Sequence, residues 1–293
     1  MNLKMLNNES FADFAIRIIN NSEEYGLTKQ QAFKELFCKD MAKDNVRKIG
    51  YLSSYIQEAI DNGYDKKFLN NKNNKLNIKN NVLIIGDLHT PFVKKGYLDF
   101  CKKMYKKYNC NKVVFIGDIL DNHYSSYHET IPDGHGAEKE LLMAKKQISD
   151  FYREFPVADV CIGNHDRIPN RKSVSSGLSS HWIKDLKDVL CTESWNYSEY
   201  FIIDDVEYTH GTGRKAINRS KQDMISVVQG HYHSDSYINF SVGKNSKRTF
   251  AMQIGCGIQE SEYAFAYGKD FAKPHINVGI VINGNLPIIE YMD

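Results

Sequence analysis

The spacing of apolar residues divides the chain into two regions. In the first, apolar residues recur at helical spacing from Phe11, from Phe33 and from Val46, which is the pattern of amphipathic helices that pack together. This pattern predicts a three-helix module over residues 1–64. Residues 65–79 are dominated by Asn and Lys and lack a periodic apolar pattern, so we expect a linker there.

From residue 80 the pattern changes to short apolar runs that end in glycine. The runs NVLIIG, KVVFIG and ADVCIG are separated by segments of helical character, and this alternation is typical of βαβ units whose parallel strands are covered on both faces. The later segments YFIIDDVEYTHG and VGIVINGNLPIIEYM predict hairpins, the second with an Asn-Gly turn. We expect an α/β domain over residues 80–293, in which these hairpins complete a second sheet.

Composition and charge restrict the setting of the protein more than its chemistry. The net charge of +2 is too small to identify an anionic partner. The six cysteines are scattered without a C-x-x-C pair, which favours a reducing, cytoplasmic setting over a disulfide framework. The N-terminus lacks the apolar core of a signal peptide, and no apolar run approaches the roughly 18 residues that span a bilayer. We therefore expect no membrane partner.

Five short polar motifs follow the apolar runs, at the predicted ends of strands. They are GDLH at 86–89, GDILDN at 117–122, GNHD at 163–166, THG at 209–211 and GHYH at 230–233. Each is weak evidence alone, because Asp and Asn are common in turns and His often has a structural role. Together they predict a metal centre, because turn chemistry does not require histidines at these places and ligands gather at the carboxyl ends of strands.

In this order the motifs resemble those of the calcineurin-like metallophosphoesterase superfamily, over about residues 80–240. The resemblance implies a four-layer α/β sandwich of two mixed sheets flanked by helices, and a centre with two metal ions. It also implies a ligand set of carboxylate, amide and imidazole groups. Asp87, His89 and His233 would hold one ion, and Asn164, His210 and His231 the other, with Asp118 bridging the two.

The donor types agree with a catalytic metal site on chemical grounds. Mixed carboxylate, amide and imidazole donors suit Mn, which we expect, with Fe, Zn or Ni as alternatives, and the lack of cysteine argues against a structural zinc site. Two divalent cations can share a hydroxide and lower its pKa to near neutrality while screening the phosphoryl oxygens. The nucleophile is then expected to be water.

The resemblance also implies that His165 is the general acid that faces the leaving-group oxygen. Asp121, the second acid of GDILDN, is the expected carboxylate that orients this imidazole and raises its pKa. A helix or turn cap is the alternative role for Asp121. Asp166 is an alternative orienting acid, or a cap of the following turn.

One position departs from the Ser/Thr protein phosphatase branch of the superfamily, where an arginine grips the substrate phosphate. That position is Asn122 here, and loss of a bidentate guanidinium weakens the case for a phosphomonoester. The nuclease branch of recombination-repair complexes and the phosphoesterases of tailed phages look more similar. We expect Asn122, His123 and Asn164 to contact substrate. The alternative is that His123, like His128 and His135, is a solvated loop histidine.

These features predict a metal-dependent phosphodiesterase that acts on DNA, in the cytoplasm of a cell or of a phage-infected host. The three-helix module is then a candidate DNA-binding unit, and a phosphomonoesterase is the alternative. A non-catalytic adaptor is disfavoured because every ligand type and His165 are present. Basic residues in 94–107 and 214–221 flank the motifs and are either a polyanion surface or solvated helix faces.

Overall fold

The computed structural model describes residues 80–127, 134–244, 246, 248–259, 261 and 273–292, together with residues 23 and 31. All helices and strands below belong to the compact unit Lys79–Asp293. The predicted three-helix module and linker lie outside the described residues, apart from residues 23 and 31, and so does His128. Their proposed roles stay predictions.

The first sheet has six strands, in the order β11-β10-β1-β2-β3-β4. Strands β1 to β4 are parallel to one another, whereas β10 pairs antiparallel with both β1 and β11. Their bounds are β1 Asn81–Ile85, β2 Lys112–Phe115, β3 Asp159–Cys161, β4 Asn196–Ser198, β10 Asn277–Ile282 and β11 Leu286–Tyr291. The three glycine-terminated runs are therefore adjacent parallel strands, as predicted.

The second sheet has five strands, in the order β5-β6-β7-β9-β8. Its middle strands β6, β7 and β9 are parallel, and each edge strand is antiparallel to its neighbour. Their bounds are β5 Tyr200–Ile203, β6 Val206–Thr209, β7 Ser226–Gln229, β8 Tyr237–Val242 and β9 Arg248–Gln253. Both sheets are therefore mixed, as expected.

Successive side chains of the buried strands point to opposite faces, and those on the inner face pack the two sheets together into one sandwich. In β1, Val82 and Ile84 pack in a cluster with Tyr208 and Met252 of the second sheet. Leu83 and Ile85 of the same strand belong to a different cluster, on the helical side. Because successive side chains of a strand point to opposite faces, a run that is apolar at every position can bury both.

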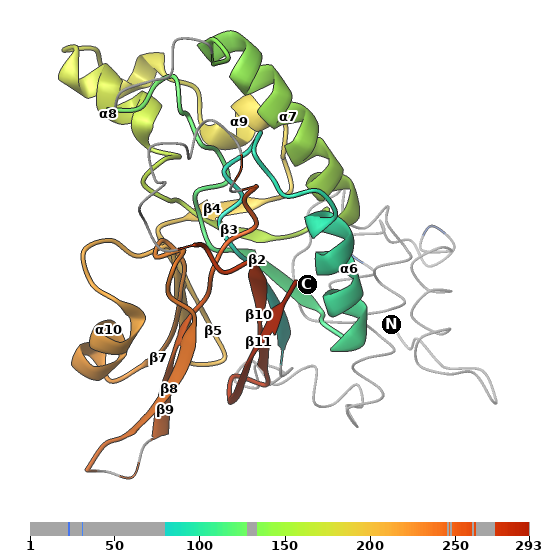
Figure 1. Ribbon diagram of the computed structural model, residues 1–293, viewed down its shortest axis with the longest axis vertical. Helices are drawn as coiled ribbons and strands as arrows, with labels where there is room; N and C mark the ends of the chain where they lie inside the picture. The colour runs from blue at the N-terminus through green and yellow to red at the C-terminus, as the bar shows by residue number, and fades with distance from the viewer. Residues whose placement is uncertain are drawn as a thin grey trace. The chain divides into compact units, whose positions relative to one another are not determined.

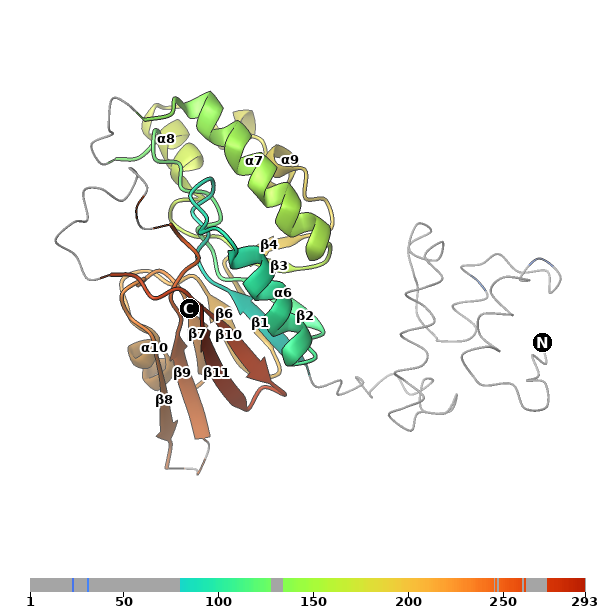
Figure 2. The ribbon, with the colours of Figure 1, turned by 45° about the vertical axis from the view of Figure 1, so that its right-hand side comes forward.

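Helices cover the outer face of each sheet (Figures 1 and 2). On the first sheet, Tyr97 of α6, Ile148 of α7 and Leu190 of α9 enter the same apolar cluster as Leu83. On the second, Ala216 of α10 packs on β7 and β9. The helix bounds are α6 Tyr97–Lys107, α7 Ala137–Glu154, α8 Ile168–Ser175, η2 Ser180–Trp182, α9 Leu186–Leu190 and α10 Ala216–Asp223. The order helix, sheet, sheet, helix confirms the predicted four-layer α/β sandwich.

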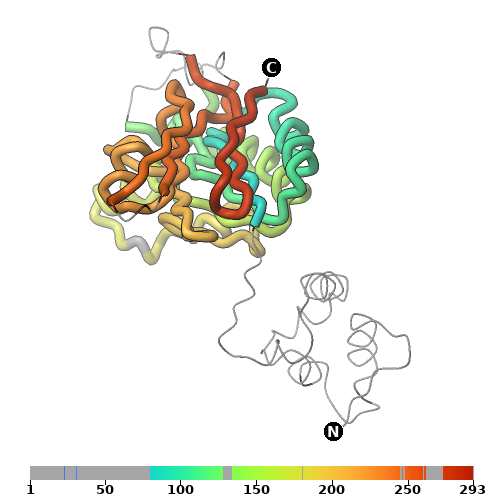
Figure 3. The backbone as a smooth tube through the Cα atoms, turned by 90° about the horizontal axis from the view of Figure 1, so that it is seen from below, coloured from blue at the N-terminus to red at the C-terminus, as the bar shows by residue number. Residues whose placement is uncertain are grey.

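Both predicted hairpins form, but they belong to different sheets. Asp204 and Asp205 form the two-residue turn between β5 and β6, both with positive φ, as such hairpin turns require. The connection between β10 and β11 has three residues, and its first two, Asn283 and Gly284, also have positive φ. The second hairpin, drawn in red in Figure 3, pairs with β1 in the first sheet. The prediction that it completes the second sheet was wrong, because the partner of a hairpin is decided by contacts almost 200 residues away in the chain.

Within the described residues, no helix is long and apolar enough to cross a membrane. Five cysteines lie in the described part of the chain, and all five are free thiols. Four of them are buried and the fifth, Cys191, is exposed.

Candidate metal centre

Three polar residues of the first sheet follow three neighbouring strands. Asp87, Asp118 and Asn164 lie just beyond the carboxyl ends of β1, β2 and β3. Because these strands are parallel, their ends meet at one edge of the sheet. Asp87 is fully buried and Asp118 is 2 % exposed, so both acids lie beneath the surface of this edge.

The histidines of the later motifs lie in loops that follow strands of the second sheet. His210 directly follows β6, and His231 and His233 follow β7, its parallel neighbour. The residues from the two sheets, separated by up to 146 positions in the chain, meet between the strand ends. The motifs are far apart in the sequence, but they meet in space because both sets of parallel strands end at the same place.

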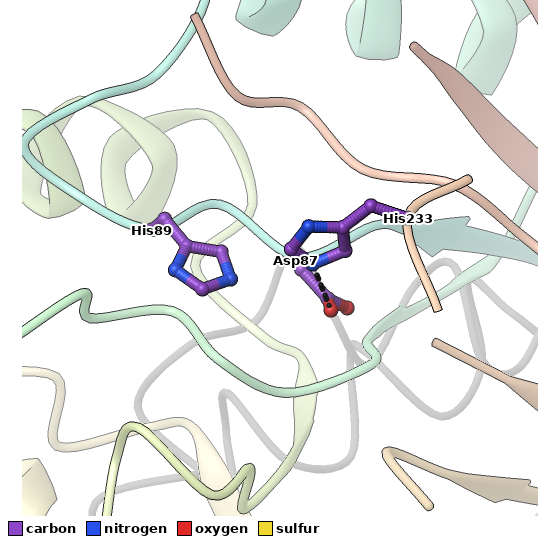
Figure 4. A group of neighbouring side chains, drawn as sticks. All are labelled: Asp87, His89 and His233. Carbon is purple, nitrogen blue, oxygen red and sulfur yellow. Dashed lines mark hydrogen bonds and ion pairs between the residues drawn. The ribbon is translucent and has the colours of Figure 1, made fainter. Parts of the chain in front are cut away.

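The first group of ligands consists of Asp87, His89 and His233, with one donor atom from each within 4.8 Å of the others. Nε2 of His233 lies 2.9 Å from Oδ2 of Asp87 (Figure 4). The backbone N–H of His231 donates to the same carboxylate oxygen over 2.9 Å. The sequence prediction grouped the same three residues around one ion.

The second group consists of Asp118, His210 and His231, again within 4.8 Å of one another. Nε2 of His210 lies 3.1 Å from Oδ2 of Asp118 and 2.9 Å from Oδ1 of Asn164. The same Asp118 oxygen is 3.7 Å from Nε2 of His89, a member of the first group. Asp118 therefore lies between the two groups, where a bridging carboxylate is needed.

Glycines next to the ligands make this convergence possible. A Cβ on Gly163 would lie 2.1 Å from Oδ1 of Asp118, and a Cβ on Gly230 would lie 2.4 Å from Oδ1 of Asp87. Any side chain at these positions would displace a carboxylate. Oδ1 of Asp87 is buried and has no hydrogen-bond partner among the described residues, which is costly unless a cation or water satisfies it. The residues present thus fit a pair of divalent cations.

The charges of the ligands are strongly coupled. Burial would raise the pKa of Asp118, but the imidazole of His210 holds that pKa well below its usual range. Burial opposes a charge on His210 in turn, yet Asp118 and Asp87 raise its pKa to about 9. For His89 and His231 burial prevails and lowers the pKa, which favours the neutral imidazole that binds metal. Loading the site therefore requires loss of a proton from His210.

His165 lies beside the two ligand groups. It contacts Asp121, but through the backbone of Asp121 and not through the predicted carboxylate. Nδ1 of His165 is 2.6 Å from the backbone carbonyl oxygen of Asp121, whereas the nearest oxygen of that carboxylate is 3.8 Å away. The carboxylate is instead 2.6 Å from Nδ1 of His89. The predicted orienting contact to His165 is thus made by the backbone. The Asp121 side chain faces a metal-ligand candidate, in the arrangement that fixes the tautomer of ligating histidines.

The tautomer of His165 follows from this contact. A carbonyl oxygen can only accept, so Nδ1 carries a hydrogen and Nε2 is the nitrogen that can exchange a proton with substrate. Burial would lower the pKa of His165, but Asp118 and Asp121 together raise it above its ordinary value. The side chain is 23 % exposed, so a substrate can reach it.

The other candidate residues have mainly structural contacts. The amide of Asn122 donates to the backbone oxygen of His165 over 2.9 Å. His123 is 5 % exposed, which disfavours a direct contact with a large substrate, and its backbone N–H donates to Glu140. Asp166 accepts from the backbone N–H groups of Leu120 and Gly163, so it joins two motifs and does not orient His165. Substrate contacts by Asn122, His123 and Asn164 stay predictions.

Two supporting residues were missed by the sequence analysis. Gln253, fully buried at the end of β9, donates to the backbone oxygens of Gln229 and Gly230, just before His231. Gln229 donates to the backbone oxygen of Arg214 and packs under Gly211, next to His210. The only sequence signal was a polar residue at the end of each apolar run.

Comparison with known proteins identifies the class of this site. The model of the family described as calcineurin-like phosphoesterase matches residues 81–258. The chain therefore belongs to that family, whose members are dinuclear metal-dependent hydrolases of phosphoester bonds. No curated protein matches the chain.

Several solved structures resemble the chain at low sequence identity. Vacuolar Protein Sorting 29 from Cryptosporidium parvum is 14 % identical, with 73 % of this chain and 92 % of that chain covered and a TM-score of 0.39. Vps29 from Chaetomium thermophilum is 11 % identical, with 73 % and 95 % covered and a TM-score of 0.35. The nuclease MPE from Pseudomonas putida is 12 % identical, with 71 % and 86 % covered and a TM-score of 0.31. The family assignment follows from the family model alone.

Proposed function

We propose that this metal-dependent phosphoester hydrolase is a phosphodiesterase that cleaves DNA with two divalent cations, Mn in the first place. Asp87, His89 and His233 would hold one cation, Asn164, His210 and His231 would hold the other, and Asp118 would be shared. When bound, the cations supply Lewis acidity that lowers the pKa of water and stabilises charge on the phosphoryl oxygens.

The residues of the chain supply the rest of the reaction. Water adds to phosphorus and releases one proton to solvent, from which His165 is reprotonated after turnover, and the bond from phosphorus to the leaving oxygen breaks. His165, held through Nδ1 by the Asp121 backbone, donates the proton on Nε2 to that oxygen. Such a donor matters most for a basic alkoxide, which is the leaving group of a nucleic acid.

The main observation in favour of a diester substrate is that the side chain of Asn122 is already hydrogen-bonded within the protein. A dianionic monoester benefits from a fork of N–H donors, but the amide nitrogen of Asn122 is used by the backbone of His165. The guanidinium that follows the third motif, Arg167, pairs with Glu199 and with the backbone oxygen of Ile162. A monoanionic diester has less need of such a fork.

The basic clusters predicted from the sequence support this proposal less than expected. Lys102 pairs with Glu154 and Lys107 with Glu290. The cluster after His210 is also paired, with Lys215 against Asp235, Arg219 against Glu207, and Arg214 hydrogen-bonded to Gln222. The four carboxylate pairs neutralise part of each cluster, so we do not assign DNA binding to them.

A substrate panel tests the proposed function. The Mn-loaded protein is incubated with single-stranded DNA, duplex DNA, RNA, cyclic nucleotides, bis(p-nitrophenyl) phosphate and p-nitrophenyl phosphate. We expect cleavage of DNA and faster turnover of the aryl diester than of the monoester. Faster turnover of the monoester, with DNA left intact, would show a phosphomonoesterase instead.

A further inference from the structure

A cavity of about 590 Å³ lies along helix α8, next to the metal centre. Its walls include Tyr127, Ile162, Arg167, Asn170 and Arg171. The volume falls within the range of sites that enclose a molecule of the size of a drug or a nucleotide. The mechanism described above uses none of these side chains.

The two segments that line this cavity, helix α8 and the residues after the second motif, each follow a motif of the proposed catalytic site. Helix α8 starts three residues after His165. The opposite wall is the segment after the second motif, which is tied to the third motif by the contact of Asn122 with His165. Further out, Nζ of Lys172 donates to the backbone oxygen of Ser126 over 3.1 Å. The two segments therefore leave the metal centre side by side.

A second cavity links this space to a ligand candidate. It has a volume of about 190 Å³ and reaches His210, and it shares Ile162, Arg167 and Glu199 with the first cavity. A groove thus continues from His210, past the ion pair of Arg167 with Glu199, to Tyr127.

The outer part of this groove combines an aromatic ring with cations. The guanidinium of Arg171 lies 5.0 Å from the centre of the Tyr127 ring, and Nζ of Lys172 lies 5.3 Å from it. Neither Arg171 nor Lys172 forms an ion pair with a carboxylate of the described residues, unlike Arg167. Tyr127 is 54 % exposed although it is a large aromatic residue. An exposed ring beside uncompensated positive charge matches a ligand that has a flat apolar part and a phosphate.

The position of His165 decides which part of a substrate enters the groove. A general acid faces the leaving oxygen, so the group that departs extends from His165, and α8 is the helix that follows His165 directly. We propose that this groove is the subsite for the nucleotide on the leaving-group side of the scissile phosphate. The base lies against Tyr127 and the next phosphate lies at Arg171. This inference rests on the proposed cleavage of DNA.

The test compares three substrates in the full-length, Mn-loaded protein. A single-stranded oligonucleotide places a nucleotide on the leaving side. Thymidine 5′-(p-nitrophenyl phosphate) keeps its nucleoside on the other side, because nitrophenolate leaves. Bis(p-nitrophenyl) phosphate has no nucleoside. Only the first places a nucleotide, with its base and its next phosphate, in the subsite.

Two variants and two matched controls are measured on each substrate. Tyr127→Ala should raise KM for the oligonucleotide by about 5- to 150-fold, the range for loss of one base stack. Arg171→Ala should reduce the slope of log KM against log salt by about 0.7, as for one phosphate contact to a single strand. Both should leave the two nitrophenyl diesters unchanged. Tyr124→Ala, also 54 % exposed, and Arg153→Ala, on α7, should change none.

The outcomes separate the subsite from the proposed function. If the oligonucleotide is cleaved and the variants behave like their controls, the subsite is wrong and cleavage of DNA stands. If Tyr127→Ala slows the thymidine ester equally, the groove binds the other side of the phosphate and the assignment is wrong. If the wild-type protein turns over the aryl diester but no oligonucleotide, the proposed function fails and the subsite fails with it.

Discussion

The two sheets contribute different chemistry to one site. The first sheet provides both carboxylates, the amide and the imidazole of His89, whereas the second provides only imidazoles. The carboxylates are fixed by backbone groups, since Asp87 accepts from the N–H of His231 and Asp118 from the N–H of His165. The acids, which are the most costly groups to bury, thus lie just beyond the ends of central parallel strands, next to loops of the other sheet.

This difference implies that changes at the first sheet have the largest effects. Asp118→Asn should lower turnover of bis(p-nitrophenyl) phosphate by about 10⁴-fold, several kcal/mol of barrier, because a neutral amide cannot bridge and balance two dications. Metal content should fall as well. Asp99→Asn, the same change on an 85 % exposed side chain, is the control. Two tightly held ions and near-normal turnover in Asp118→Asn would refute the bridging role.

His165 is held by the loops of the first sheet and is the proposed proton donor to the leaving group, so the effect of changing it should depend on the substrate. His165→Asn should keep metal binding and slow the cleavage of an unactivated diester by about 10²- to 10⁴-fold, the range for a positioned proton donor. An activated aryl diester should be slowed far less, because nitrophenolate departs without a proton. An equal loss on both substrates would indicate a binding role.

A variant of Asp121 tests whether its side chain orients His89 or His165. Asp121→Asn should weaken metal affinity by about 10- to 100-fold, as for loss of a carboxylate behind a ligating histidine. The ratio of the rates on activated and unactivated diesters should stay at its wild-type value, because the backbone carbonyl that holds His165 remains. Titration with Mn and rates on the two kinds of diester measure these separately. Unchanged affinity with a selective loss of rate on the unactivated diester would restore the sequence-based assignment.

The smallest expected effect concerns packing between the strand ends. Gly163→Ala places a Cβ against Asp118 and should cost about 1–3 kcal/mol of unfolding free energy, as overpacking does. Urea denaturation in the presence of a chelator measures this without the metals. Gly136→Ala is the matched control, because nothing lies within 4 Å of that Cβ. Equal stability of the two variants would show that the strand ends move apart easily.

Local patterns predicted most of the fold and the proposed ligands. The runs around β1, β2 and β3 are apolar at successive positions and end in glycine, so each strand and its motif could be placed without knowledge of the rest. The grouping of ligands came from the resemblance to the family. The structure brings the same residues together.

The errors concern contacts that depend on distant residues or on loop conformation. The choice of β1 as partner for the second hairpin depends on strands far apart in the chain. The ion pair of Lys107 with Glu290 joins residues 183 positions apart. It partly neutralises a lysine that the sequence offered as part of a polyanion surface. The contact between Asp121 and His89 joins two loops in which Asp118 and His89 adopt positive φ, and sequence spacing does not predict that loop conformation. Supporting amides such as Gln253 have no motif of their own.

The central claim is a pair of cations bridged by Asp118, and a direct count of bound metal tests it best. The purified protein is saturated with Mn, freed of excess metal by gel filtration, and analysed for metal content and by electron paramagnetic resonance. We predict two ions per chain, with a spectrum of coupled Mn that is lost in Asp118→Asn. One ion per chain, or two ions without magnetic coupling, would contradict the bridged centre.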